Sequence, residues 1–68
     1  MKISGNKLLE ARSAAGVTRA DLATIADLTH VRIWQLETEA ESNINENVVN
    51  AMAIYLNVTP DQLKAEEP

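Results

Sequence analysis

The residues of this sequence that could do chemistry are poorly suited to catalysis and to metal binding. The 68-residue chain has no cysteine and a single histidine, which excludes a cysteine-based zinc site and a cluster of histidine ligands. It also lacks a glycine-rich phosphate loop, a nucleophile paired with a base, and two carboxylates in a setting suited to proton transfer. We therefore predict that the protein is not an enzyme and needs no cofactor or metal ion, so its function is expected to lie in binding.

One segment is suited to binding a large partner. The stretch TRADLATIADLTHVRIWQLE, residues 18–37, has the pattern of two short helices with a sharp corner at Asp27. A helix of about nine residues, a three-residue turn and a further helix define the helix-turn-helix, which places its second helix in the major groove of DNA. The whole chain, however, carries a formal charge of −4, which opposes binding to a polyanion. The sequence therefore raises the question of whether an acidic chain uses this segment on DNA.

The ends of the helices are marked by local signals. A capping Ser, Thr or Asn stands between an apolar residue and a second apolar residue four positions further on, at Ser4, Thr18, Thr29, Asn45 and Thr59. Residues that tolerate a left-handed backbone follow three of the helices, at Gly16, Asp27 and Asn57. No stretch alternates apolar and polar residues, which predicts an all-α fold without strands. The signals predict helices at about 4–15, 18–26, 29–38, 45–56 and 59–65.

Apolar residues at helical spacing predict which faces are buried. The inward residues of the first four predicted helices are Leu8, Leu9, Ala15, Leu22, Ala23, Ala26, Ile33, Leu36, Val49, Met52, Ala53 and Leu56. Val58 and Leu63 are expected to close the bottom of the same core.

Length and composition predict one small domain. Hydrophobic residues make up 46% of the chain, enough for a packed core without disulfides. No apolar run approaches the ~20 residues of a membrane span, and the N-terminal MKISGNK lacks the apolar centre of a signal peptide. We expect a cytoplasmic protein without membrane contacts. Residues 1–65 are assigned to the domain and residues 66–68 to an acidic tail or the start of a linker, so the chain is either complete or the first domain of a longer protein.

From about Leu8 to Leu63 the sequence resembles the lambda-repressor-like, or Xre/Cro-type, helix-turn-helix regulators. The similarity lies in LLEARSAAGVTRADLA before the corner, in LTHVRIWQLE as the third helix, and in NAMAIYLNVTPDQL as the last two helices. The resemblance implies a compact five-helix domain and a sequence-specific DNA-binding transcriptional regulator, a repressor, that acts on double-stranded DNA as a homodimer. The alternative is a protein-interaction module on the same scaffold, with weakened DNA binding and a protein partner.

The resemblance also implies which residues meet DNA. The third helix would lie in the major groove, and the matching positions are Arg19, Thr29, His30, Val31, Arg32, Gln35 and Thr38. Arg32 suits a bidentate contact to guanine, Gln35 one to adenine, and Val31 a contact with a thymine methyl group. Arg19 stands where the family usually has a phosphate-contacting glutamine. The alternative is that these are ordinary exposed residues of a small helix.

A second implication of the resemblance is structural. Arg12, late in the first helix, and Glu37, late in the third, match a pair of residues that often form an ion pair in these repressors. Such a pair would fix the two helices against each other rather than add much stability, because desolvation offsets the Coulomb attraction. The alternative is two solvated surface charges.

The sequence also departs from the family. Asp27 replaces the usual glycine of the corner, and Trp34 stands where a small or polar residue is usual, as a partly packed side chain or as an exposed anchor. Glu39 and Glu41 stand where the family tends to be basic. Residues 1–38 hold five basic and four acidic side chains, a net charge of +1, whereas residues 39–68 hold one basic and six acidic, a net charge of −5. We therefore expect weak non-specific DNA binding and a strong reliance on base contacts and dimerisation.

The fourth predicted helix has a second apolar side. Val48, Ala51 and Tyr55 follow one helical stripe, with Ile54 beside it. An exposed apolar surface of this kind often marks a partner site, so these four residues form a candidate dimer interface. The alternative is that they fold down over the last helix and the neighbouring loop of their own domain.

Overall fold

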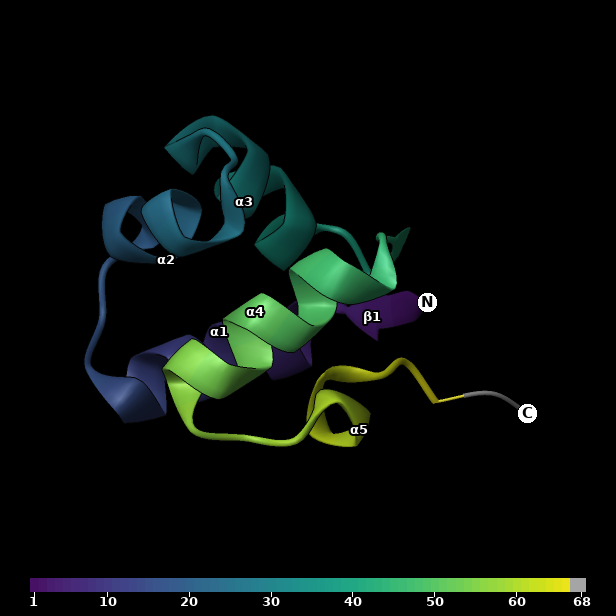
Figure 1. The fold of residues 1–68 in the computed structure, drawn as a ribbon. Coiled ribbons are helices and arrows are strands. Elements are labelled where there is room, and N and C mark those ends of the chain that lie inside the picture. The colour runs from purple at the N-terminus through teal and green to yellow at the C-terminus, as the bar shows by residue number, and fades with distance from the viewer. Residues whose placement is uncertain (67–68) are drawn as a thin grey trace.

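The structure, a computed structural model, describes residues 1–66. The predicted tail at residues 66–68 therefore lies, apart from Glu66, outside the described residues. In chain order the elements are β1 (Lys2–Ser4), α1 (Gly5–Ala15), α2 (Arg19–Ala26), α3 (His30–Thr38), β2 (Glu41–Asn43), α4 (Glu46–Leu56) and α5 (Pro60–Leu63). In Figure 1, α4 crosses the middle of the molecule with α1 behind it, α2 and α3 lie above them, and α5 lies below.

The predicted helix limits are confirmed to within one residue, except at the end of α5. Side chains of four predicted caps, Ser4, Thr18, Thr29 and Asn45, accept backbone N–H groups of the helices they begin. At the fifth, the Gln62 side chain accepts the backbone N–H of Thr59 at 2.8 Å. The three predicted stop residues all have left-handed backbones, with φ of 70° at Gly16, 56° at Asp27 and 59° at Asn57. Each helix start, and the ends of α1, α2 and α4, therefore have a local cause in the sequence.

The prediction of an all-α chain without strands is wrong in one respect. Strands β1 and β2 pair in antiparallel register, with Ile3 opposite Ser42, and Ile3 also forms a bridge with Lys64. Each strand has only three residues, of which one faces the core, so no alternation could be recognised in the sequence. The bridge also explains why α5 ends at Leu63 rather than at residue 65: the chain becomes extended at Lys64 and runs beside β1.

A single apolar core lies between the helices. Its fully buried side chains are Ile3, Leu8, Leu22, Ile33, Leu36, Val49, Met52 and Leu63, each contributing about 1.5–3 kcal/mol by leaving water. Three predicted core residues differ: Leu9 and Val58 are only half-buried, and Ala15 is exposed because it ends α1 beyond the packed part of that helix. No helix of the described residues has the length and apolar character needed to cross a bilayer.

Candidate nucleic-acid interface

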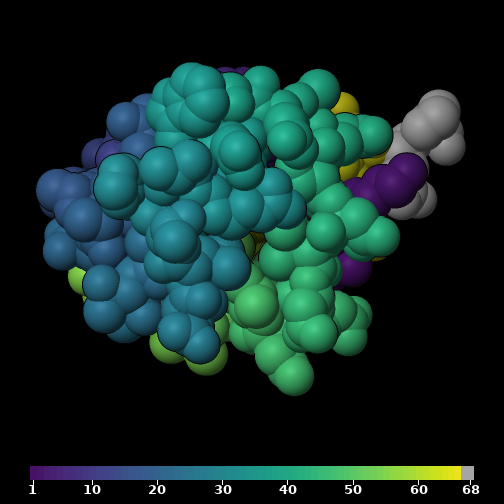
Figure 2. All heavy atoms as spheres, turned by 90° about the horizontal axis from the view of Figure 1, so that it is seen from above, coloured from purple at the N-terminus to yellow at the C-terminus, as the bar shows by residue number. Residues whose placement is uncertain are grey.

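Helix α3 presents a continuous outward face. Ile33 and Leu36 are fully buried and hold the helix on the core. The exposed residues His30, Val31, Trp34, Gln35 and Thr38 recur at the spacing of one helical stripe. Viewed from above, α3 lies between α2 on one side and residues 39–50 on the other (Figure 2). The structure therefore brings most of the sequence-predicted contact residues onto one surface.

The polar side chains of α3 differ in whether they already form hydrogen bonds within the domain. The Thr29 hydroxyl accepts the backbone N–H of Arg32 at 3.1 Å, and the Thr38 hydroxyl donates to the carbonyl of Gln35 at 3.0 Å. Both threonines therefore serve the ends of their own helix. Arg32 Nη1 lies 3.5 Å from Gln35 Oε1, a long contact at the surface. The half-buried Arg32 and the exposed Gln35 thus keep most of their side-chain donors and acceptors free of other contacts within the described residues.

Below this surface, Glu37 joins three helices. Its side chain is 1% exposed, and it accepts from Arg12 Nε at 2.6 Å and from Arg19 Nε at 2.8 Å. Arg12 also donates to the Val17 carbonyl at 3.0 Å and, from Nη2, to Glu37 Oε1 at 3.4 Å. We call these three side chains the junction cluster. Arg12 and Glu37 are not solvated surface charges, so the pair that the resemblance implied is a buried contact between α1 and α3.

Sequence reasoning missed the second arginine of this cluster. The resemblance links Arg19 only to phosphate, because it stands where the family usually has a phosphate-contacting glutamine. In the structure its Nε is held by the carboxylate of Glu37, and its side chain is 42% exposed. Arg19 and Glu37 are eighteen residues apart, and no local pattern links them. Only the packing of α2 against α3 places the two side chains together.

Sequence reasoning also missed Gly5, which sets how closely the start of α1 approaches the end of α3. It is buried at the first position of α1, and its N–H donates to the carbonyl of Ala40 at 3.4 Å. A Cβ atom at this position would collide with the carbonyl oxygens of Leu36 and Glu39. Only glycine allows the two backbones to approach this closely. The sole sequence signal was a glycine directly after a helix cap, where it does not favour the helix.

The corner between α2 and α3 contains a residue with a strained backbone. Asp27 has φ 56° and ψ 42°, and its N–H and that of Leu28 bond to carbonyls of the last turn of α2, at Thr24 and Ala23. This left-handed geometry is the usual helix stop for glycine, and aspartate adopts it at some cost. Asp27 therefore ends α2 with the left-handed backbone that a glycine usually provides at such a corner.

The edge beyond α3 is acidic. Glu39 and Glu41 are both exposed, and Glu39 Oε2 accepts the hydroxyl of Ser42 at 2.6 Å. That hydrogen bond ties the carboxylate to the middle residue of β2. Residues 39–50 form the neighbouring surface in the same view (Figure 2). Negative charge thus borders the outward face of α3 on this side.

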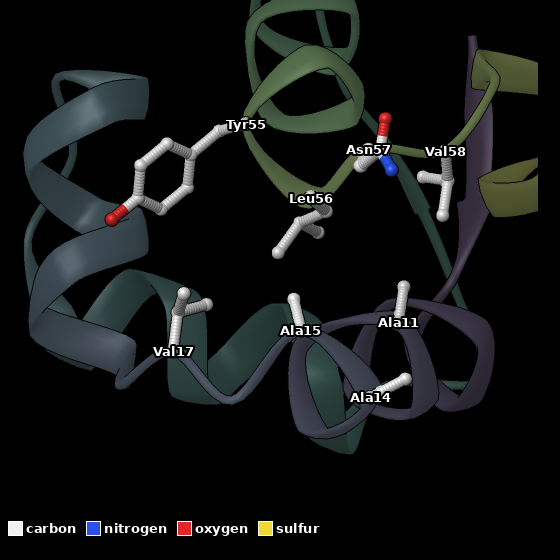
Figure 3. Close-up of a pocket in the computed structure, with 8 residues that line it drawn as sticks. All are labelled: Ala11, Ala14, Ala15, Val17, Tyr55, Leu56, Asn57 and Val58. Atoms are coloured by element: carbon white, nitrogen blue, oxygen red, sulfur yellow. The ribbon is translucent and has the colours of Figure 1, made fainter.

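The candidate dimer residues on α4 divide into two groups. Val48 and Ala51 are half-buried, and Val48 packs against the domain's own core. Ile54 is 80% exposed and Tyr55 is 39% exposed. Tyr55 borders an open groove of about 540 Å³ between the ends of α1 and α4, lined by small apolar side chains such as Ala11 and Ala15 and by the polar Asn57 (Figure 3). Ile54 does not fold down over its own domain, so this end of α4 is an uncovered apolar surface.

Comparisons with known proteins identify the fold. No protein-family model matches the sequence, and no curated protein does. The chain is similar in structure to the restriction-modification controller protein C.AhdI from Aeromonas hydrophila, with a TM-score of 0.71 and 24% identity. The match covers 85% of this chain and 83% of that one. The chain therefore has the lambda-repressor-like helix-turn-helix fold that its sequence predicted.

Proposed function

We propose that the protein is a sequence-specific DNA-binding transcription regulator, a repressor, which reads the major groove with α3. The observation that carries this proposal is the outward face of α3. Gln35 on that face offers the groups that recognise adenine, and the half-buried Arg32 beside it offers those that recognise guanine. Ile33 and Leu36 fix the helix to the core. The similarity to a controller protein supports a regulatory role.

The charge distribution fits a binder that depends on specific contacts. The acidic border at Glu39 and Glu41 disfavours close approach of phosphates on one side of α3. Non-specific affinity is then low, and discrimination among sequences comes from bases contacted by α3. Replacing both glutamates with lysine should strengthen binding to any duplex and steepen its salt dependence. An unchanged salt slope would show that this edge stays away from the backbone of DNA.

Homodimerisation is part of the proposal. Regulators of this architecture read two half-sites related by a two-fold axis, and a dimer doubles the number of base contacts. The uncovered end of α4, with Ile54 and Tyr55, offers an apolar surface for the second copy. The protein would then bind inverted repeats spaced by one turn of the double helix.

The decisive experiment is selection of duplexes from a random-sequence pool at low salt, followed by affinity measurements on the selected site and on unrelated DNA. Arg32→Ala and Gln35→Ala should each weaken binding to the selected site by about 1–3 kcal/mol and leave unrelated DNA nearly unaffected. Ser13→Ala, at an exposed position of α1, is the matched control and should bind like the parent. Two α3 variants that bind the selected site as tightly as the parent would contradict the assignment.

A second candidate function has its own observation. Val31 and Trp34 are 52% and 51% exposed on α3, so the proposed reading surface carries two large apolar side chains. Such a surface also suits a protein partner. If the random pool yields no enriched sequence and the protein retains no duplex at low salt, the interaction module replaces the DNA-binding regulator as the proposed function.

A further inference from the structure

We propose that Glu37 is a positioning residue that holds Arg19 as a pre-oriented phosphate ligand at the start of α2. The inference rests on the proposed DNA-binding function and deepens it, because it assigns one backbone contact to a particular geometry. Its basis is the junction cluster, in which a single buried carboxylate holds two arginines of unequal exposure.

The two arginines use their donors differently. Arg12 donates through all three of its nitrogens, to the two oxygens of Glu37 and to the Val17 carbonyl, and its side chain is 14% exposed. Arg19 is 42% exposed, and its one hydrogen bond within the described residues runs from Nε to Glu37 Oε1. A guanidinium has five N–H donors. Arg12 is therefore held inside the fold, whereas the terminal nitrogens of Arg19 are available to a ligand.

The charge of the cluster favours an anion. One carboxylate and two guanidinium groups leave a net charge of +1, and the more exposed partner, Arg19, carries it to the surface. Terminal guanidinium nitrogens form the bidentate contact that suits a phosphate. Because Glu37 already fixes the Nε end, less side-chain freedom is lost when a phosphate binds. An acidic protein with few basic side chains gains most from cations that are held in place in this way.

Arginine is required for this arrangement, and lysine cannot replace it. A lysine has a single nitrogen, so its three N–H donors start from one point and cannot pair with Glu37 at one end while presenting a two-pronged contact to a phosphate at the other. Arg19→Lys therefore keeps the charge but loses the bridge. Arg19→Gln loses both. Lys64→Gln, at an exposed position on the other side of β1, removes the same charge without touching the cluster and serves as the matched control.

The first measurement is the salt dependence of binding to a mixed-sequence duplex. Arg19→Gln removes the charge that neutralises a phosphate, whether or not the glutamine still touches it, and should lower the slope of log K against log salt by about 0.9. Arg19→Lys should lie closer to Arg19→Gln than to the parent, and Lys64→Gln should match the parent. An Arg19→Lys slope equal to the parent's would overturn the inference, because charge alone would then suffice. A parent that binds no duplex would overturn the proposed function itself, and this inference with it.

The second measurement follows the side chain directly. In ¹⁵N-arginine-labelled protein, the Nε–H signal of Arg19 should keep its position when the duplex is added, because its bond to Glu37 persists. The Nη signals of Arg19 should shift and become protected from exchange, whereas those of Arg12 should not. Loss of the Nε–H signal on binding, or unperturbed Nη signals in a protein that binds the duplex, would contradict the positioning role.

Discussion

The junction cluster and the C-terminal half of α4 meet their surroundings in opposite ways. At the junction, a charged residue that is almost inaccessible to water has both carboxylate oxygens occupied by donors from two other helices. At the end of α4, Ile54 is 80% exposed and Tyr55 borders an open groove. The first region is complete within one chain, whereas the second leaves apolar surface in water. The contrast indicates that the domain orients α3 by itself, and it leaves at the end of α4 the surface that we propose for the second copy.

The largest effect should come from removing the carboxylate at the junction. Glu37→Ala leaves Arg12 buried without its counter-charge, and we expect a loss of about 3–5 kcal/mol in the free energy of unfolding. Denaturant titration followed by circular dichroism measures it. Glu41→Ala, at an exposed site, should change stability by about 0.5 kcal/mol or less. Equal effects of the two variants would remove the distinction between a complete junction and an ordinary surface.

Gly5→Ala should destabilise the contact between the start of α1 and the end of α3. The added methyl group collides with carbonyl oxygens at the end of α3, so α1 and α3 must move apart, at an expected cost of about 1–3 kcal/mol. Thermal unfolding provides the measurement. Ser13→Ala adds no atoms at an exposed position of the same helix and should unfold like the parent. A parent-like Gly5→Ala would mean that the close approach does not determine the position of α3.

The α4 surface should respond in assembly rather than in stability. Ile54→Asp combined with Tyr55→Ser should weaken self-association by about 2 kcal/mol or more, while helix content and unfolding stay close to the parent. Sedimentation over a range of concentrations gives the association constant. Val48 is a poorer test position, because it packs against the core. Ile25→Asp places the same charge on an exposed apolar site of α2 and should leave association unchanged. A parent that stays monomeric at high concentration would contradict this use of α4.

The smallest effect concerns the corner and should be stabilising. Asp27 holds a left-handed backbone that glycine adopts without strain, so Asp27→Gly should raise the free energy of unfolding by about 1 kcal/mol. Asn57→Gly, at the equivalent stop after α4, is the comparison variant and should gain a similar amount. A shift in melting temperature reports both. Destabilisation by Asp27→Gly alone would show that the carboxylate itself supports the corner.

Local features of this fold could be predicted from the sequence, and non-local ones could not. The caps and stops were found because each involves residues a few positions apart whose side chains favour a helix end. The pairing of Ile3 with Ser42 joins segments far apart in sequence, and three residues are too few to form a recognisable pattern. Ala15 had the right spacing for the core but lies beyond the length of α1 that the other helices cover.

In the candidate site, too, local features could be predicted from the sequence and contacts between helices could not. Exposure of His30, Val31 and Gln35 followed from helical spacing once α3 was placed. The second partner of Glu37 and the close approach at Gly5 depend on the exact distance between helices. A family resemblance predicts a contact between two helices only when both residues match positions that are known to pair in the family, as Arg12 and Glu37 do. Arg19 differs from the family's usual residue, so its contact with Glu37 could be seen only in three dimensions.

The outward face of α3 and the end of α4 each carry one aromatic side chain that absorbs ultraviolet light. The chain has one tryptophan, one tyrosine and no phenylalanine. Trp34 is half-exposed on α3, and Tyr55 lies at the end of α4. Emission excited at the red edge of the absorption band comes from Trp34 alone and reports events on α3. The near-ultraviolet difference spectrum of Tyr55 reports the α4 surface in the same sample. The unlabelled protein thus carries a separate optical reporter for each of its two exposed faces.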